Sequence, residues 1–253
     1  MANKGFVAAS DGDRVAIVAG LRTPFVKSGS AYRHLTPLDL GKLVVTELIE
    51  RADLDPACVD KVVYGQVVPS PDAPNIAREI VLGTRLPRTI EAYSVSRACA
   101  TSTQAMTEAA MSILVGEIDV AICGGADSLS RPPITYSDHF IEALMTANAA
   151  KEPFAKARAF LDLKPKDFLP KPPALKEPST GLTMGESAEK MARDNHIERA
   201  AQDAFAARSH RRSAAAWEKG IYEAEVMHVA VPPYDEAVSR DGLVRPDTTE
   251  EKL

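Results

Sequence analysis

Apolar and polar positions follow two different periods along the first half of the chain. Runs that are rich in β-branched residues, or that alternate in polarity, predict short strands at 14–20, 62–64, 93–96 and 120–123. Apolar residues spaced three and four positions apart predict helices at 37–49, 75–82 and 101–115. Because strands alternate with helices, we predict an α/β fold whose mostly parallel sheet is covered by helices.

The pattern changes at residue 130, where prolines interrupt the chain repeatedly. Short apolar stretches between them predict helices at 140–149, 154–161 and 198–219, and alternation at 226–231 predicts a further strand. We therefore predict two domains. Residues 1–129 form the α/β part, and residues 130–253 form a largely helical insertion with a small core of its own.

The segment 92–106 contains the strongest candidate chemistry. A predicted strand leads into small residues around Cys99, and the helix that follows is apolar on nearly all sides, so we expect that helix to be buried. A cysteine at a helix N-terminus faces backbone N–H groups that favour the nucleophilic thiolate. Ala98 and Ala100 leave room for an acyl group. Free cysteines are also often buried fillers, so a packing role remains open for Cys99.

Composition narrows the class of protein. The 253 residues are 26% charged and 45% hydrophobic, with a net charge of −5, which argues against a general nucleic-acid binder. Three separated cysteines and five histidines show neither disulfide nor metal-site spacing, so we predict no metal. Residues 1–10 lack the features of a signal or transit peptide, and with the separated cysteines this leads us to expect a cytoplasmic location.

Several segments resemble the thiolase family, the enzymes that cleave or form 3-ketoacyl-CoA. The resemblance extends in order over essentially the whole chain and is greatest to the fatty-acid-oxidation thiolases of bacterial trifunctional complexes. The fold that it implies is the N-terminal half of a thiolase with an inserted loop domain. The matching segments are 14–25, 65–68, 73–79, 93–105, 121–128, 179–189 and 209–212.

The resemblance implies an acyltransferase, a 3-ketoacyl-CoA thiolase of fatty-acid β-oxidation, in which Cys99 forms the acyl-enzyme. CoA and acyl-CoA would be substrates, with no tightly bound cofactor. Met184 and Gly185 match residues that line the acyl-chain path, and Arg245 matches an arginine that contacts CoA. From the residues alone, Met184 is as easily a packing residue and Arg245 a solvated charge.

Thiolase chemistry also needs groups that lie in the C-terminal half of family members. They are a histidine of a Gly-His-Pro motif and a second, proton-transferring cysteine. We therefore expect this chain to be one subunit of a split enzyme, completed by a chain that carries the C-terminal half; the alternative explanation is a truncated or proteolysed product. The resemblance also implies a homodimer through the region of Tyr93 and Arg97, and a hydratase/dehydrogenase subunit is a further expected partner.

Two questions remain open at this stage. The stretch 136–176 mixes apolar and basic residues, which suits either peripheral contact with an anionic membrane or a hairpin packed on a partner subunit. The chain could also be a non-catalytic acyl-CoA-binding or scaffold module, or part of a biosynthetic acetoacetyl-CoA thiolase. The resemblance to degradative thiolases favours a 3-ketoacyl-CoA thiolase of fatty-acid β-oxidation over these two alternatives.

Overall fold

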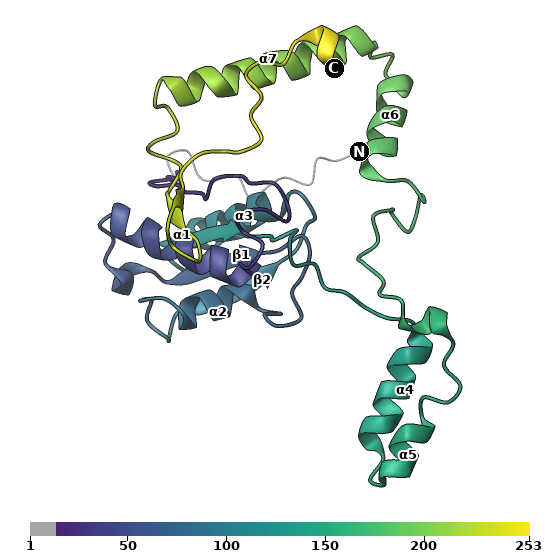
Figure 1. The fold of residues 1–253 in the computed structure, drawn as a ribbon. Coiled ribbons are helices and arrows are strands. Elements are labelled where there is room, and N and C mark those ends of the chain that lie inside the picture. The colour runs from purple at the N-terminus through teal and green to yellow at the C-terminus, as the bar shows by residue number, and fades with distance from the viewer. Residues whose placement is uncertain (1–13) are drawn as a thin grey trace, which may run out of the picture. The chain divides into compact units, whose positions relative to one another are not determined.

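A three-stranded parallel sheet forms the centre of the first part of the chain (Figure 1). The computed structural model describes residues 14–253, and residues 1–13, which include the segment predicted to lack a targeting signal, lie outside the described part. The strand order is β2 (Glu91–Val95), β1 (Lys61–Gly65), β3 (Ala121–Gly125). Because the strands are parallel and in register, their carboxyl ends meet at one edge.

Two helices cover one face of this sheet. α1 (Pro37–Arg51) begins at Thr36, whose side chain forms a reciprocal capping box with Asp39, and α2 (Ile76–Leu82) begins at the N-cap Asn75. Both helices were predicted from their apolar spacing and are confirmed. With the sheet they enclose a closed apolar core, formed by Val45, Ile49, Val59, Val62, Tyr64, Ile76, Ala77, Ile80, Val81, Leu86, Ile90 and Ile122.

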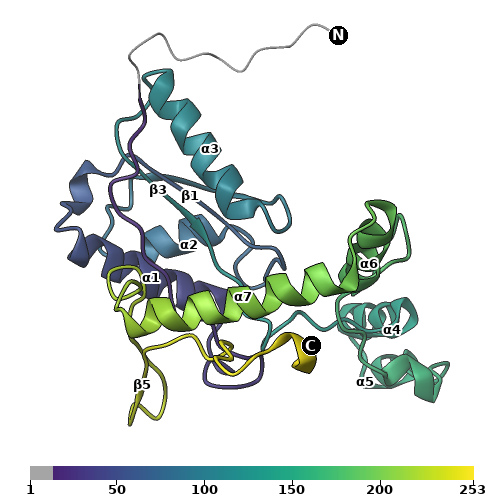
Figure 2. The same cartoon turned by 90° about the horizontal axis from the view of Figure 1, so that it is seen from above.

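The opposite face of the sheet carries α3 (Thr101–Leu114) (Figure 2). The prediction that this helix is buried all round is wrong. Its buried residues are Thr101, Ala105 and Ala109, whereas Met106 is 39% exposed. The helix contacts the strands along one side, and its small buried residues allow a close approach to them. The exposed residues of the helix are Ser102, Thr103, Met106 and Thr107, so Met106 is the large apolar side chain that faces solvent here.

The prediction of a buried strand at 14–20 is also wrong. This segment forms no strand, and the side chains of Ile17 and Val18 are 81% and 89% exposed. A strand requires a neighbouring backbone to pair with. Backbone pairing begins only at Arg22, which forms a parallel bridge with Val226.

The C-terminal segment returns to this part of the molecule after a long helix. α7 (Arg199–Glu218) is followed by a small antiparallel pair, β4 (Val229–Ala230) and β5 (Ala237–Val238). The carboxylate of Asp241 accepts two hydrogen bonds from the Arg22 guanidinium, at 2.7 and 2.9 Å, and a third from the backbone N–H of Phe25. Tyr32, Leu40, Met227 and Val229 form a second apolar cluster beside this ion pair.

Contacts divide the chain into two compact units. The first unit contains the residues up to 131 and residues 199–253, and the second unit contains residues 132–198. The contacts thus place 199–253 with the sheet, whereas the proposed domain division assigns residues 130–253 to the loop domain. Short 3-10 helices occur at Pro56–Cys58, Pro165–Phe168 and Glu250–Lys252.

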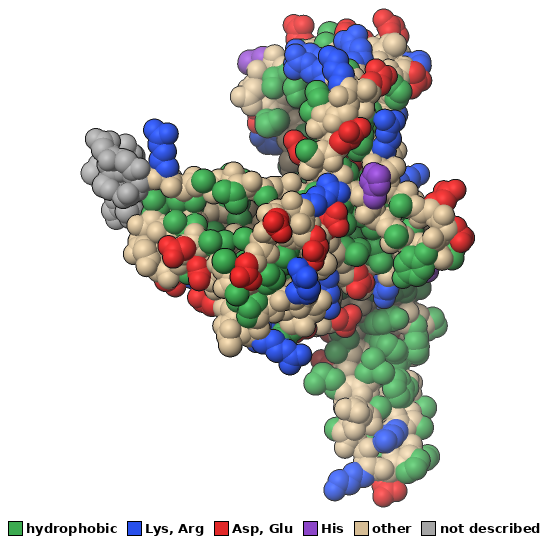
Figure 3. Space-filling model, turned by 90° about the vertical axis from the view of Figure 1, so that its left-hand side faces the viewer, with side chains coloured by type: hydrophobic (Ala, Val, Ile, Leu, Met, Phe, Trp, Pro, Cys, Tyr) green, Lys and Arg blue, Asp and Glu red, His purple; other side chains and the backbone are tan. Residues whose placement is uncertain are grey.

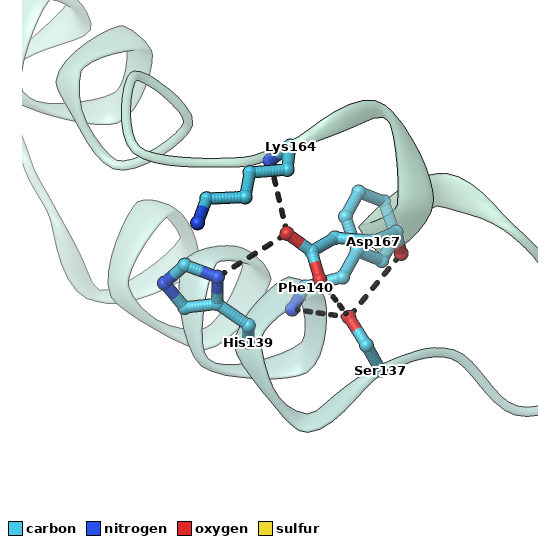
Figure 4. A network of polar contacts seen from close by, with 5 residues as sticks. All are labelled: Ser137, His139, Phe140, Lys164 and Asp167. Carbon is cyan, nitrogen blue, oxygen red and sulfur yellow. Dashed lines mark hydrogen bonds and ion pairs between the residues drawn. The ribbon is translucent and has the colours of Figure 1, made fainter.

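The second unit is largely helical, as predicted. It contains α4 (Asp138–Ala149), α5 (Pro153–Arg158) and α6 (Met184–Asp194). Its main polar anchor is Asp167 (Figure 4).

The buried carboxylate of Asp167 accepts hydrogen bonds from the backbone N–H of Lys164 at 2.9 Å and the Ser137 hydroxyl at 3.2 Å, and lies 3.3 Å from His139 Nδ1. The Lys164 N–H, and then His139 and Ser137, hold the pKa of Asp167 below its ordinary value. The carboxylate thus fastens the segment 164–168 to the first turn of α4.

Candidate functional site

The turn from β2 to α3 presents Cys99 at the carboxyl edge of the sheet. Ala98 adopts a left-handed backbone conformation with φ of 45°, and Arg97 and Cys99 form a bridge around it. The buried hydroxyl of Thr101 accepts a hydrogen bond from the backbone N–H of Arg97 at 2.8 Å and donates one to the carbonyl of Ala98 at 2.7 Å. One side chain therefore fixes both sides of the turn.

Two glycines let this turn sit directly on the strand ends. A Cβ atom on Gly65 would lie 2.2 Å from both Thr101 Cγ2 and the Val95 carbonyl oxygen. A Cβ on Gly125 would lie 2.8 Å from Ser102 Oγ. Any side chain at Gly65 would collide with the first turn of α3. The glycine end of β3 is thus close-packed against the first turn of α3.

Cys99 is exposed, together with all of residues 96–100. A cysteine that serves only as a core filler would be buried, as Cys123 is in part, where burial raises the pKa of the thiol. Ala100, the N-cap residue of α3, supplies no side-chain hydrogen bond to the helix N-terminus. The thiol can therefore be reached by a reactant, and it lies next to a helix start without a side-chain cap.

A row of polar side chains extends from the turn along α3. The Arg97 guanidinium donates to Gln104 Oε1, and Gln104 Nε2 donates to Glu108 Oε1, both at 2.6 Å. Gln104 and Glu108 are the two strongly polar residues of this helix. No sequence pattern indicated the contact of Gln104 with Arg97, seven positions earlier, whereas the spacing of four residues between Gln104 and Glu108 on a helix is a signal for the second contact.

Arg245 lies in the first unit, against α7. Its backbone N–H donates to His210 Nδ1 at 3.2 Å, and its Nη2 lies 3.3 Å from His210 Nε2. No local pattern in the sequence indicates this contact, because the two residues are 35 positions apart. Neither residue has a described contact with Cys99.

Met184 and Gly185 open α6 in the second unit. The Met184 side chain is 57% exposed, and a Cβ on Gly185 would have only Thr183 Oγ1 within 4.0 Å. An open hollow of about 630 Å³ lies along this helix. Charged residues dominate its lining, so the hollow by itself is not an apolar path for an acyl chain. It is lined by Leu182, Gly185, Glu186, Glu189, Lys190, Arg193 and Asp194.

Comparison with known families fits this arrangement. The family description "Thiolase, N-terminal domain" matches residues 15–253. The chain belongs to the thiolase family. As a thiolase, it is 47% identical over 251 residues to a 3-ketoacyl-CoA thiolase from Pseudoalteromonas translucida, an alignment that covers 99% of this chain and 58% of the relative. The chain is 51% identical to a 3-ketoacyl-CoA thiolase from Aeromonas salmonicida, and that alignment covers 92% of this chain and 54% of the relative.

Solved thiolase structures share the fold. The Bacillus anthracis acetyl-CoA acetyltransferase superposes with a TM-score of 0.78 at 28% identity, over 93% of this thiolase chain and 56% of the other. A thiolase from Ascaris suum, solved in complex with coenzyme A, gives a TM-score of 0.73 at 25% identity. The superposition covers 93% of this chain and 56% of the Ascaris suum chain. The predicted α/β thiolase fold is confirmed. The chain spans a little more than half the length of the relatives it matches.

Within residues 14–253, no three or more histidine, cysteine, aspartate or glutamate side chains are grouped so that they could hold a metal ion. The same described part contains no helix that is both long enough and apolar enough to cross a membrane.

Proposed function

We propose that this chain is the nucleophile-bearing half of a 3-ketoacyl-CoA thiolase that degrades fatty acids in the bacterial cytoplasm. The observation that carries the proposal is the exposed Cys99 on a fixed turn at the strand ends. Relatives named 3-ketoacyl-CoA thiolase, at 47–51% identity, support the substrate class. A structural neighbour in complex with coenzyme A supports CoA as a second substrate.

The proposed reaction has two steps. In the first, the Cys99 thiolate attacks the 3-keto carbonyl, the bond between C2 and C3 breaks, and acetyl-CoA leaves as a carbanion that takes up a proton. In the second, the thiol of free CoA gives up its proton and attacks the Cys99 thioester, which releases the shortened acyl-CoA. No cofactor takes part, and this chain contributes the sulfur that carries the acyl group.

The proton transfers require groups that we assign to the C-terminal half of the fold. We propose that a second chain supplies this half, and a further segment of the same polypeptide would meet the same chemical need. The exposed Ile17 and Val18, and the exposed Met106 on α3, support the need for a covering layer. A second copy of the chain is proposed to pair through the region of Tyr93 and Arg97, on the outer strand β2.

Three assignments outside the nucleophile turn belong to the same proposal. Met184 and Gly185 contact the acyl chain, and Arg245 contacts the nucleotide end of CoA. A hydratase/dehydrogenase subunit is a further proposed partner, because its product would be the substrate here.

The α4–α5 hairpin is proposed to touch a membrane surface. Figure 3 shows hydrophobic side chains on its surface. Met145, Phe154 and Leu161 are 69%, 80% and 75% exposed, and basic residues lie between them in the sequence. Co-sedimentation with anionic vesicles, but not with neutral ones, is the expected result. Packing of the hairpin on a partner subunit would instead leave the assembled protein in the supernatant with both.

Trapping the acyl-enzyme tests the central step. The assembled protein is incubated with a 3-ketoacyl-CoA without free CoA, and the adduct is located by mass spectrometry of peptides. We expect an acyl group on Cys99, loss of the adduct in Cys99→Ala, and an unchanged adduct in Cys58→Ala, which removes another exposed thiol.

Two alternatives give different results. If CoA binds normally but Cys99 never becomes acylated, the chain is a non-catalytic acyl-CoA-binding scaffold. If only acetoacetyl-CoA reacts across a series of chain lengths, the enzyme is a biosynthetic acetoacetyl-CoA thiolase.

A further inference from the structure

His210, on α7, contacts Arg245 through both nitrogens of its ring. Nδ1 lies 3.2 Å from the backbone nitrogen of Arg245, and Nε2 lies 3.3 Å from Nη2 of its guanidinium. The two residues are 35 positions apart, so this contact holds the C-terminal segment against the helix. Arg199, eleven residues earlier on α7, donates to the carbonyl of Leu253 and fastens the same segment a second time.

The hydrogen bond at Nδ1 determines where the imidazole proton lies. A backbone N–H can only donate, so Nδ1 must present its lone pair to Arg245, and the neutral ring then carries its proton on Nε2. A guanidinium also has only donors. The Nε2–H of His210 and the Nη2–H of Arg245 are therefore two neighbouring donors that cannot satisfy each other.

Among residues 14–253, no hydrogen-bond acceptor contacts these two donors. Arg245 forms no ion pair among residues 14–253, and it is exposed to solvent. Asp247, the nearby carboxylate that acts on Arg245 electrostatically, is itself paired with the Lys252 ammonium at 2.8 Å. The residues one turn away from His210 on α7 carry no charge. They are Ala206, Ala207, Ser213 and Ala214.

We propose that His210 and Arg245 together bind one phosphoryl group of CoA, with His210 as a ligand-binding residue in its own right. This inference rests on the proposed contact of Arg245 with the nucleotide end of CoA. A phosphoryl oxygen can accept from both donors at once, and hydrogen bonds to a charged oxygen are the stronger kind. The bond from the Arg245 backbone presets the ring orientation before the ligand arrives.

Titration of the full chain with adenosine 3′,5′-bisphosphate, the nucleotide end of CoA, tests this. The probe is NMR of a sample with ¹⁵N-labelled histidine and arginine side chains. We expect the His210 Nε2 and Arg245 side-chain signals to shift together with one Kd. Adenosine 5′-monophosphate and adenosine 3′-monophosphate, titrated separately, show which of the two phosphates is bound.

Three variants separate the contribution of the ring from that of the helix. His210→Phe keeps a flat ring but loses both nitrogens, and we expect Kd to rise about tenfold, the loss of one hydrogen bond to a charged group. His210→Gln keeps one acceptor and one donor, and should recover most of that loss. Arg211→Ala removes the adjacent positive charge without touching the contact, and should change Kd by less than about twofold.

The outcomes distinguish this inference from the proposed function. If Arg245→Ala weakens binding but His210→Phe, shown to be folded by circular dichroism, does not, Arg245 binds the phosphate without His210 and this inference is overturned. If Arg245→Ala has no effect, or the bisphosphate does not bind, the proposed role of Arg245 fails as well. Equal losses in His210→Phe and His210→Gln would mean that neither ring nitrogen makes a contact that the amide can replace, which also contradicts the proposal.

Discussion

At the scale of single residues, the turn before α3 holds an unfavourable backbone conformation next to the nucleophile. A left-handed φ costs a residue with a Cβ atom roughly 1–2 kcal/mol, and Ala98 adopts one at 45°. The Thr101 hydroxyl bonds to the backbone on both sides of Ala98 and so holds this geometry. The strain is tolerated where it directs Cys99 away from the sheet.

We predict that Ala98→Val lowers the free energy of unfolding by about 1–2 kcal/mol, because a β-branched side chain tolerates positive φ poorly. Ala100→Val is the matched control, since Ala100 is also exposed but has φ of −95°. Urea denaturation of the two variants measures the difference. Equal losses would show that crowding of the exposed turn, rather than the backbone angle, sets the cost.

Residue types and their order could predict part of the site. The position of Cys99, between a strand and a helix and among small neighbours, could be inferred locally. The backbone angle at Ala98 could not, because left-handed positions are usually occupied by glycine or asparagine. The contact between His210 and Arg245 was equally out of reach, since it depends on how a distant segment returns to α7.

At the scale of elements, the contact between β1 and α3 depends on the absence of a side chain. We predict that Gly65→Ala lowers the free energy of unfolding by about 1–3 kcal/mol, because the added methyl group would lie 2.2 Å from Thr101 Cγ2 at the start of α3 and 2.2 Å from the Val95 carbonyl oxygen at the end of β2. Gly20→Ala is the control, since a Cβ there meets nothing within 4 Å. A loss of stability in both variants alike would contradict the proposed close packing.

The Asp167 network gives the second unit a defined dependence on pH. Its folded pKa is lowered, so its stabilising effect is present above the ordinary carboxyl value of 3.8 and is lost as pH falls through the folded value. We predict that amide hydrogen exchange at Phe140 and Ile141 in α4 accelerates in that acidic range, beyond the intrinsic pH effect. In Asp167→Asn the exchange should already be fast at neutral pH, and a pH-independent protection in the native chain would refute this.

The elements that were predicted well and those that were predicted badly differ in one physical respect. α1 and α2 carry their own start signals and pack on a face that this chain completes, so apolar spacing was sufficient. Ile17 and Val18 in the segment 14–20, and Met106 on α3, are equally apolar, yet all three are exposed. Hydrophobic pattern shows that a residue prefers burial, but it does not show which chain provides the covering surface.

At the scale of the whole molecule, the first unit is closed by a contact between its two ends. Arg22 and Asp241 lie 219 positions apart, and their paired hydrogen bonds join the start of the chain to the segment after β5. Beyond this ion pair toward the N-terminus, the chain runs exposed past Ile17 and Val18. The chain also covers only 54–58% of its thiolase relatives. An apolar segment at the border of half a fold is where we expect the other half to attach.

This expectation gives the last prediction. Ile17→Lys should leave the unfolding of the isolated chain nearly unchanged, because the side chain is already 81% exposed, but it should abolish co-purification with the C-terminal half. Leu175→Lys, equally exposed at 81% in the second unit, should leave both unaffected. Two results together would contradict this prediction: the isolated chain is a monodisperse, non-aggregating monomer, and Ile17→Lys still assembles with the C-terminal half. They would mean that the exposed segment needs no covering surface. In that case the apolar surface at 14–20 would have to be explained without a second half, and the proposal that this chain contributes only the nucleophile would lose its structural support.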